Sequence, residues 1–419
     1  MKLSKRFPAL ASQDFSIFWV GQFLSLIGTW MQSTTLPYLA YRLTGKPLDL
    51  GLIGFAATLP TLILALPAGV IVERLDNRKT VIVMQFIMAL QALTLAILTL
   101  TGHIQMWHIA FLAFILGSAS AFEITARQSM LVELVGKAAL PNAIALQTAI
   151  FNGARVLGPS ISAVVLVLIK NQGEGWAFLF NSVSYLFIII GLFFVKTPFK
   201  AVSINTTSGE RNLIREFKEG QRYILGNSTV GLVILMAALI GFFGFPFIQQ
   251  IPALARDVLH QISDTETIVK TRNSALYIAQ GIGALIASVY ISLFSGLKRK
   301  GVLLAIGQVI FAASLILISI TKSIPLNYLL MVILGWAMVT QLALMNTLIQ
   351  INIPDSLRGR VFSTYLWALQ GVAPFGSLFI GWMAQTRGIP SAALVSGIAC
   401  LVSVLSLHIL KPSIVRKTY

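Results

Sequence analysis

Twelve long apolar runs follow one another along the chain, and they constrain its fold more than any other feature. A helix needs about 20 mostly apolar residues to cross a hydrocarbon core of about 30 Å. Because backbone groups in lipid need internal hydrogen-bond partners, and the runs are too long for barrel strands, we expect an all-α membrane protein with twelve transmembrane helices. The runs cover 15–41, 49–72, 80–101, 104–126, 141–169, 174–195, 226–252, 273–295, 301–321, 325–351, 361–385 and 391–410.

Composition agrees with a membrane protein and argues against several other classes. The 419 residues are 56% hydrophobic and 11% charged, whereas soluble domains are about 25% charged. The net charge of +17 comes from bases in short loops between the runs, so we expect no nucleic-acid partner. The single cysteine, Cys400, excludes an internal disulfide and a thiolate metal site, and we expect no metal and no cofactor.

The distribution of Lys and Arg predicts the orientation in the membrane. With the N-terminus inside, 22 of the 31 bases lie on the cytoplasmic side, eight lie outside, and Arg155 lies within a run. Lys270 and Arg272 are among the bases assigned to the outer loops. We therefore expect both termini in the cytoplasm. The first run continues without a small-residue cleavage site, so we also expect it to be retained as a span.

The longest polar stretch within the membrane region, 196–222, divides the runs six plus six. A basic loop at 73–79, after the second run, has a counterpart at 297–300, after the eighth. Duplicated six-helix units are typical of transporters whose site lies between the two halves near mid-membrane. We predict two pseudo-symmetric six-helix bundles, 1–195 and 226–419, joined by a cytoplasmic linker at 196–225.

An ordered set of motifs carries a family resemblance over nearly the whole chain. The first half contains GQFLSLIGTWMQ, LAYRLTGKPLDLGLIGF, LPAGVIVERLDNRK, ARQSMLVELV and ARVLGPSISA, and the second half contains RGRVFSTYLWALQGVAPFGSLFIGW. Together they resemble the branch of the major facilitator superfamily that includes the enterobactin exporter and macrolide efflux proteins, the transmembrane secretion effector family. Members usually carry Asp where this chain has Glu73, and commonly Asp where it has Thr29.

The resemblance implies the major facilitator fold and a monomer in the bacterial inner membrane. It also implies secondary active export of a small amphipathic molecule, such as a drug or siderophore, with H+ as the coupling ion and no enzyme activity. An importer or facilitator of the same fold, such as a lysophospholipid carrier, remains the alternative. The chain has no GxxxxGK[ST] loop, so we expect no ATP hydrolysis.

Few ionisable residues lie within the runs, and each one is a functional candidate because a charge at mid-membrane costs about 2.5–3.5 kcal/mol. Glu123 and Arg127 are four residues apart and share a helix face. They form either a structural ion pair or the site of a proton-coupling carboxylate. Arg155, near Gln147 and Asn152, needs either an anionic partner, which could be Glu123 or an anionic substrate, or a water-filled cavity.

Polar residues form a stripe on the first run. Gln22, Ser25, Thr29 and Gln32 follow spacings of three, four and three, which place them on one helix face. The stripe either lines a cavity or supplies hydrogen bonds between helices. Single polar residues in the second half are further candidates for the substrate cavity: Gln280, Gln341, Asn346 and Gln370.

The loop after the second run is the candidate for conformational switching. By the resemblance, Glu73 meets the N-terminus of the eleventh span near Arg358 and Arg360 in one conformation. A carboxylate at that helix end gains roughly 0.3–1 kcal/mol. The alternative is that the basic loop only holds the topology. The other residues of the loop motif are Gly69, Arg74, Asp76, Arg78 and Lys79.

Overall fold

The computed structural model describes residues 7–72, 74–169, 172–197, 199, 213–293, 299–354 and 357–410, and in these ranges it contains helices and no strand. The helices of the first half are α2 (Gln13–Thr44), α3 (Pro47–Val72), α4 (Asn77–Leu100), α5 (Met106–Leu168) and α6 (Gly173–Phe194). Those of the second half are α7 (Leu213–Gly226), α8 (Ser228–Leu239), α9 (Ile251–Ala253), α10 (Glu266–Leu293), α11 (Lys300–Ile320), α12 (Ile324–Asn352), α13 (Arg358–Leu366), α14 (Ala373–Arg387) and α15 (Ile389–Leu410).

The helices account for all twelve predicted spans. Nine helical stretches in the described ranges are long and apolar enough to cross a membrane. One of them, α5, has 63 residues and holds both the fourth and the fifth run, with Gly136 at φ 70° breaking the helix between them. The polar-striped α2 and the C-terminal α15 supply the other two spans. The predicted twelve-helix, all-α membrane fold is confirmed.

Two spans depart from regular α-helix. The seventh continues from α8 through a π-helical turn, η2 (Ile240–Gly244), and a 3-10 turn, η3 (Phe245–Gln250). The eleventh joins α13 to α14 through another π-helical turn, η6 (Trp367–Gly371). A side chain at Gly241 would meet the Leu369 carbonyl oxygen 2.1 Å from its Cβ, so the glycine lets the irregular turns η2 and η6 pack backbone to backbone.

Contacts divide the chain into two compact units. Unit 1 comprises Met1–Thr44, Ala56–Ile204 and Ser263–Ile278, and unit 2 comprises Gly45–Phe55, Asn205–Ile262 and Ala279–Tyr419. Each unit thus includes a short segment that the order of the spans assigns to the other half. The predicted division into 1–195, a linker at 196–225, and 226–419 stays a prediction. In the linker, the structure describes 199 and the helix α7, as well as 196 and 197.

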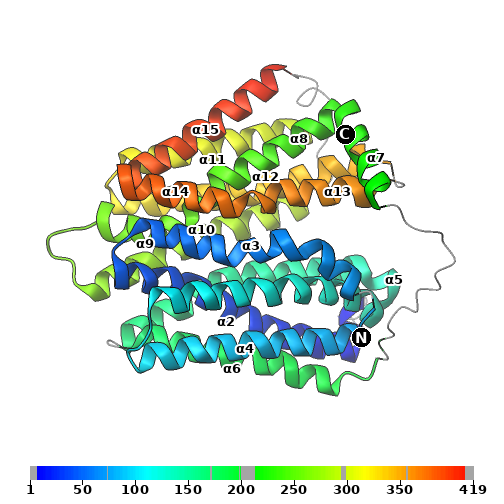
Figure 1. Ribbon diagram of the computed structural model, residues 1–419, viewed down its shortest axis with the longest axis horizontal. Helices are drawn as coiled ribbons and strands as arrows, with labels where there is room; N and C mark the ends of the chain where they lie inside the picture. The colour runs from blue at the N-terminus through cyan, green and yellow to red at the C-terminus, as the bar shows by residue number, and fades with distance from the viewer. Residues whose placement is uncertain are drawn as a thin grey trace. The chain divides into compact units, whose positions relative to one another are not determined.

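In unit 1, α2 and α4 each pack against α5 and α6 (Figure 1). A core cluster that includes Phe15, Phe18, Ile188 and Leu192 fills one end of these helices. The Asp14 carboxylate accepts hydrogen bonds from the Thr197 hydroxyl and backbone N–H, at 2.6 and 2.8 Å, and so ties the start of α2 to the chain after α6.

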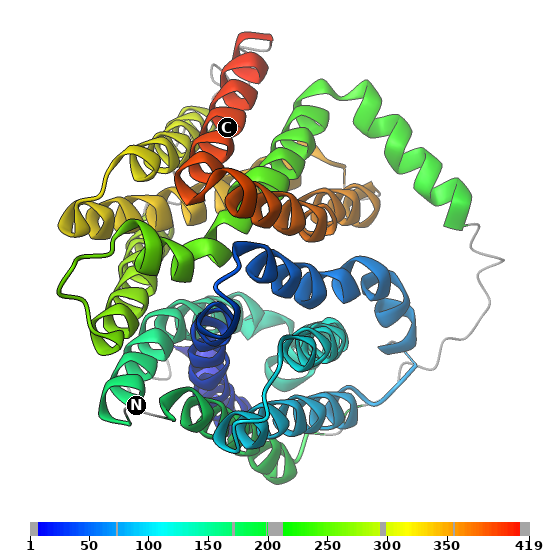
Figure 2. The same ribbon diagram turned by 60° about the vertical axis from the view of Figure 1, so that its left-hand side comes forward.

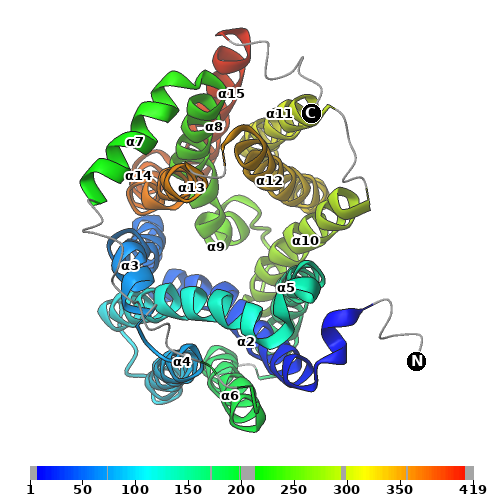
Figure 3. The ribbon, with the colours of Figure 1, turned by 90° about the vertical axis from the view of Figure 1, so that its right-hand side faces the viewer.

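In unit 2, α11 packs against α12 and α15, while α8 contacts α12, η2 and η6. Figure 2 shows a sharp bend between α7 and α8, where the Asn227 side chain caps α8 by accepting from the Val230 N–H at 3.3 Å. On the N-terminal side of this bend, α7 packs against α13 (Figure 3). The Tyr223 hydroxyl of α7 also donates to the Asn352 carbonyl at the end of α12, at 2.7 Å.

The close approach of α5 to α2 depends on Gly158, whose Cβ, if present, would lie 2.8 Å from both Ile27 O and Met31 N. Gly158→Ala should therefore lower the unfolding temperature in detergent, with an overpacking cost of about 1–3 kcal/mol. Gly153→Ala on the same helix is the control, because its new Cβ would meet only a Phe23 ring carbon at 3.7 Å. Equal unfolding temperatures for the two variants would contradict this account of the packing.

Candidate functional site

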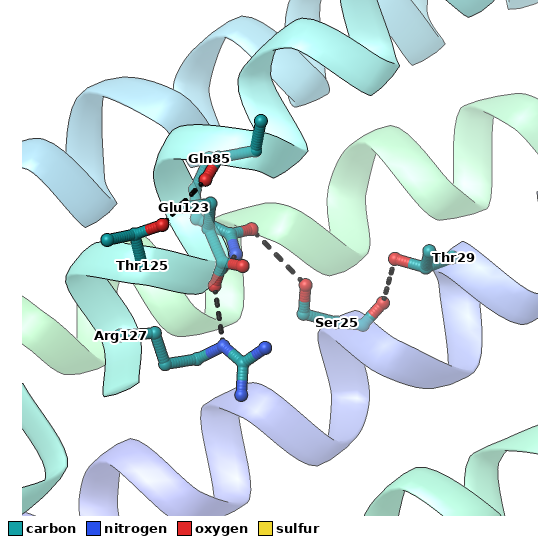
Figure 4. A network of polar contacts seen from close by, with 7 residues as sticks. Ser25, Thr29, Gln85, Glu123, Thr125 and Arg127 are labelled. Carbon is teal, nitrogen blue, oxygen red and sulfur yellow. Dashed lines mark hydrogen bonds and ion pairs between the residues drawn. The ribbon is translucent and has the colours of Figure 1, made fainter. Parts of the chain in front are cut away.

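Glu123 is buried in α5, with 4% of its surface exposed. Its Oε1 accepts a hydrogen bond from Arg127 Nε at 2.9 Å and another from Gln85 Nε2 of α4 at 3.2 Å (Figure 4). A buried carboxylate is tolerated when a cation and hydrogen bonds replace the lost water. The predicted pairing of Glu123 with Arg127 therefore forms, and Gln85 adds a third member that the sequence analysis did not identify.

Gln85 connects this pair to α2. Its Oε1 accepts a hydrogen bond from the Ser25 hydroxyl at 3.3 Å. One turn further along α2, Thr29 Oγ1 donates to the Ser25 carbonyl at 2.9 Å and hydrogen-bonds the Tyr185 hydroxyl of α6 at 3.2 Å (Figure 4 shows Ser25 and Thr29). Thr29, at the position where the family resemblance implied an acid, is therefore engaged in a contact between α2 and α6.

From Tyr185 the hydrogen bonds continue through Asn181 of α6 to Gln32 of α2 and Gln91 of α4. Asn181 Nδ2 lies 3.5 Å from the Tyr185 hydroxyl and donates to Gln32 Oε1 at 2.7 Å. Gln32 Nε2 donates in turn to Gln91 Oε1 of α4 at 3.1 Å. Four helices thus share one connected set, here called the polar network: Arg127, Glu123, Gln85, Ser25, Thr29, Tyr185, Asn181, Gln32 and Gln91.

The polar network shows what the stripe on the first span does in this conformation. Ser25, Thr29 and Gln32 hydrogen-bond other helices, which was one of the two interpretations of the stripe. Gln22 is also buried, and its Oε1 has no hydrogen-bond partner in the described part of the chain. That the stripe also lines a substrate cavity stays a prediction.

Arg155 lies on α5 above the ring of Trp30 from α2, with its guanidinium carbon 5.1 Å from the ring centroid. The ring face carries partial negative charge, which attracts a guanidinium. Nearby, Trp30 packs edge to face with Phe151 at 5.4 Å. Asn152 Nδ2 donates to the Thr148 carbonyl at 2.9 Å, and the buried Nε2 of Gln147 makes no hydrogen bond among the described residues.

The four candidates of the second half have separate surroundings. Gln280 Nε2 donates to Met338 Sδ at 3.7 Å, a weak contact. Gln341 is fully buried, yet neither of its amide atoms has a hydrogen-bond partner in the described ranges. Asn346 Oδ1 accepts from Gln350 Nε2 on its own helix, and Gln370 is exposed. A shared role in substrate binding stays a prediction.

The loop at 73–79, the candidate for conformational switching, is described except for Glu73. The side chain of Arg358 also lies outside the described residues. Asp76 caps α4 by accepting from the Lys79 N–H at 3.0 Å, and Arg78 donates to the Phe193 carbonyl at the end of α6 at 3.2 Å. Arg74 is exposed and Gly69 has open space beside its Cα. Switching by this loop stays a prediction.

Arg360, at the start of α13, has a carboxylate partner in unit 2. Its Nη1 donates to Glu219 Oε2 of α7 at 2.6 Å. In the next turn, Gln221 Nε2 of α7 donates to Thr364 Oγ1 at 3.2 Å. Helix α7 therefore holds Arg360, which the resemblance assigned to the gate. No motif in the sequence indicated the contact between Glu219 and Arg360.

The sequence model of the transmembrane secretion effector family matches residues 4–417. The chain belongs to this family of the major facilitator superfamily. The predicted resemblance is thereby confirmed, and the protein is a transporter, with many spans in a bacterial membrane.

Relatives of the transporter include two proteins named for efflux and a third named as a transporter. The multidrug efflux pump Tap of Mycolicibacterium fortuitum is 22% identical over 90% of both chains. The staphyloferrin A transporter of Staphylococcus aureus is 24% identical over 92% of this chain and 93% of its own. Macrolide efflux protein A of Streptococcus pyogenes is 22% identical over 93% of this chain and 94% of its own.

Solved structures show the same fold. A variant of the nucleoside transporter NupG superposes with a TM-score of 0.73 at 11% identity, covering 95% of this chain and 100% of its own. A bacterial homolog of the human lysosomal transporter Spinster, in an inward-facing and unoccupied conformation, gives a TM-score of 0.71 at 14% identity over 97% and 99% of the two chains. At these identities the likeness shows the fold alone.

The transporter has a second set of buried charges, which the sequence analysis missed. Lys270 and Arg272 lie in a helix rather than in a loop, because α10 begins at Glu266 rather than at 273, and both side chains are buried. Their assignment to the outer side of the membrane stays a prediction. Arg272 forms an ion pair with Asp264 at 2.6 Å, and Lys270 lies 3.5 Å from Glu174 of α6. These acidic partners allow the charges to be buried.

One sequence signal could have revealed this helix start. Lys270, Asn273, Tyr277 and Gln280 repeat the spacing of three, four and three that marks the polar stripe of the first span. The predicted eighth run begins only after Arg272, because a hydropathy count excludes charged residues and cannot register that each charge has a partner.

A double-mutant cycle tests whether Gln85 acts through Glu123. Gln85→Leu should cost about 1.5–3 kcal/mol of unfolding free energy, because it removes a hydrogen bond to a charged group. Combined with Glu123→Gln, it should show a coupling energy of about 0.5–3 kcal/mol, measured by unfolding in mixed micelles with increasing SDS.

Gln91→Leu is the matched control, since Gln91 is an equally buried amide of α4 that bonds Gln32 instead of Glu123. Its effect should add to that of Glu123→Gln. Equal coupling for Gln85 and Gln91 would mean that Gln85 only fills space between helices.

Proposed function

We propose that the transporter is a secondary active exporter of a small amphipathic molecule, driven by protons that move in the opposite direction. The observation that carries the proposal is the buried Glu123 carboxylate, held by Arg127 and Gln85 inside a hydrogen-bonded set that spans four helices. Ionisable groups at membrane depth are expensive and mark ion pathways. The printed names of relatives, a multidrug efflux pump and a macrolide efflux protein, support export.

Glu123 is the proposed coupling carboxylate. In its ionised form it accepts from both Arg127 Nε and Gln85 Nε2 through one oxygen. Protonation removes the negative charge, so both contacts weaken, and the change reaches α2 because Gln85 also bonds Ser25. A ligand can shift a conformational equilibrium only by its different affinity for the two states. The proton would shift the equilibrium by binding Glu123 most tightly in the conformation in which Arg127 and Gln85 are displaced from it.

The proposed contact for the solute on unit 1 is the face formed by α2 and α5 around Arg155. Trp30 and Phe151 offer aromatic surface for an apolar body, while Arg155, Asn152 and Gln147 offer polar groups. Sites of this kind bind mostly through apolar surface and use a few polar groups for orientation. The combination fits an amphipathic solute, with an electronegative group of the solute near Arg155.

Glu123→Gln should abolish active efflux without changing the amount of protein in the membrane. The measurement is retention of fluorescent or radiolabelled amphipathic compounds, macrolides among them, in cells lacking their own exporters, with and without a protonophore. The wild type should lower retention only when the proton gradient is intact, and Glu123→Gln should match the wild type treated with protonophore.

Glu133→Gln is the control, since Glu133 is an acid of the same helix whose carboxylate accepts from Asn77 Nδ2 at 2.8 Å, outside the polar network. That variant should keep its efflux. Efflux that ignores both the protonophore and Glu123→Gln would instead indicate a facilitator, and accumulation above the outside concentration would indicate an importer.

A further inference from the structure

The first turn of α6 buries an acid that the proposed function does not use. Glu174 has no exposed surface. It lies between Gly173 and Gly175, which pack so closely on Leu166 of α5 and Leu100 of α4 that a Cβ at either would come within 2.8 Å of them. The first turn of α6 thus packs closely on α4 and α5, and the Glu174 side chain between these glycines is fully buried.

Charge, rather than hydrogen bonding, holds this carboxylate. Neither oxygen of Glu174 accepts a hydrogen bond from the described residues. Its Oε1 lies 3.3 Å from Arg42 Nε of α2 and 3.5 Å from Lys270 Nζ of α10. Glu123, in contrast, accepts two hydrogen bonds. The two cations are therefore the groups that compensate the negative charge of the buried Glu174 carboxylate.

The two cations are unequal. Lys270 is almost completely buried, with 3% of its side chain exposed, whereas 31% of the Arg42 side chain is exposed. Solvent screens the partly exposed cation more strongly than the buried one. Arg42 and Lys270 are the charged groups that contact Glu174 in the described ranges, and losing Lys270 would remove the less screened of the two.

We propose that Glu174 is a second proton-binding site of the transporter, and that a proton and Lys270 compete for its carboxylate. The proton would add to the carboxylate to give a neutral carboxylic acid, with Oε2 open to carry it, while Lys270 keeps its charge and leaves. This proposal rests on proton-driven transport as far as its role in the cycle is concerned, but binding of the proton can be measured without transport.

Competition at Glu174 would connect proton binding to the position of α10. Lys270 lies in Ser263–Ile278, the segment of unit 1 whose helix continues into unit 2 at Ala279. The Tyr38 hydroxyl of α2 also donates to Glu266 at the start of this segment, whereas Asn273 and Ser274 in the next turn are buried without hydrogen-bond partners in the described part. Because linkage is reciprocal, a proton on Glu174 would weaken the contact of this segment with α6. Movement of the segment away from α6 would in turn strengthen proton binding at Glu174.

Glu174 also shares a helix face with part of the polar network. Asn181 and Tyr185 follow it on α6 at spacings of seven and four residues, which is one side of a helix. Seven residues correspond to roughly 10 Å along the helix axis. Glu123 thus joins the polar network through Gln85, and Glu174 lies on α6 two turns before Asn181, another member of the network. This arrangement would suit two proton sites in a single pathway.

Infrared difference spectroscopy of the full-length transporter in liposomes tests the competition directly. At one fixed pH near neutral, Lys270→Met should gain the C=O stretch of a single protonated carboxyl group relative to the wild type. Lys270→Arg, which keeps a cation at the position, should match the wild type. The gained band should disappear in Lys270→Met/Glu174→Gln and persist in Lys270→Met/Glu123→Gln.

A band that survives the Glu174→Gln substitution, or no gained band at all, would overturn the proposal. If Lys270→Met does not fold, the double variant Lys270→Met/Glu174→Gln, which removes both charges together, takes its place. Acidification should then produce a carboxyl band in the wild type that the double variant lacks, and identical spectra would sink the idea.

The outcome is separable from the fate of the proposed function. Efflux that ignores a protonophore, together with a Glu174 band, would leave a proton site in a transporter that is not proton-driven. Proton-driven efflux without that band would remove the second site alone.

Discussion

The contact of Glu123 with Arg127 and Gln85 illustrates the constraint on which the structure depends, the high cost of removing a charge from water. Each buried charge discussed above has a partner contributed by another residue of the fold: Arg155 lies over Trp30, Arg272 contacts Asp264, and Lys270 contacts Glu174. These partnerships determine which faces of the helices meet, because an unpaired charge would make any other packing unfavourable.

Small residues make the polar contacts possible. Gly28 of α2 faces Ser184 and Asn181 of α6, and a Cβ there would come within 2.5 Å of the Asn181 side-chain oxygen. Since association of helices in lipid relies on close packing and hydrogen bonds rather than on the hydrophobic effect, such glycines matter greatly. Such glycines bring α2 near enough to α6 for the short side chain of Thr29 to reach the Tyr185 hydroxyl.

Family membership and residue geometry contribute different parts of the functional picture. The match over residues 4–417 assigns a transporter of a family that includes efflux proteins. The geometry locates two carboxylates in different settings, one held by hydrogen bonds and one held by charge alone. Thr29, where the family resemblance implied an acid, occupies the middle of the polar network. These two carboxylates, Glu123 and Glu174, are the sites at which we propose that protons bind.

Sequence alone determined the all-α class, the twelve spans and the family, because hydrophobic length and motif order are properties of the chain itself. It also paired Glu123 with Arg127, since residues four apart on a helix are neighbours whatever surrounds them. Tertiary structure alone decided that Gln85 bridges Glu123 and Ser25, that Glu219 holds Arg360, and that Lys270 is buried against Glu174. Those partners lie 38 to 141 residues apart, and no local periodicity encodes which helices meet. Hydropathy placed Lys270 in a loop for the same reason: the charge is tolerated inside only because another helix supplies its partner.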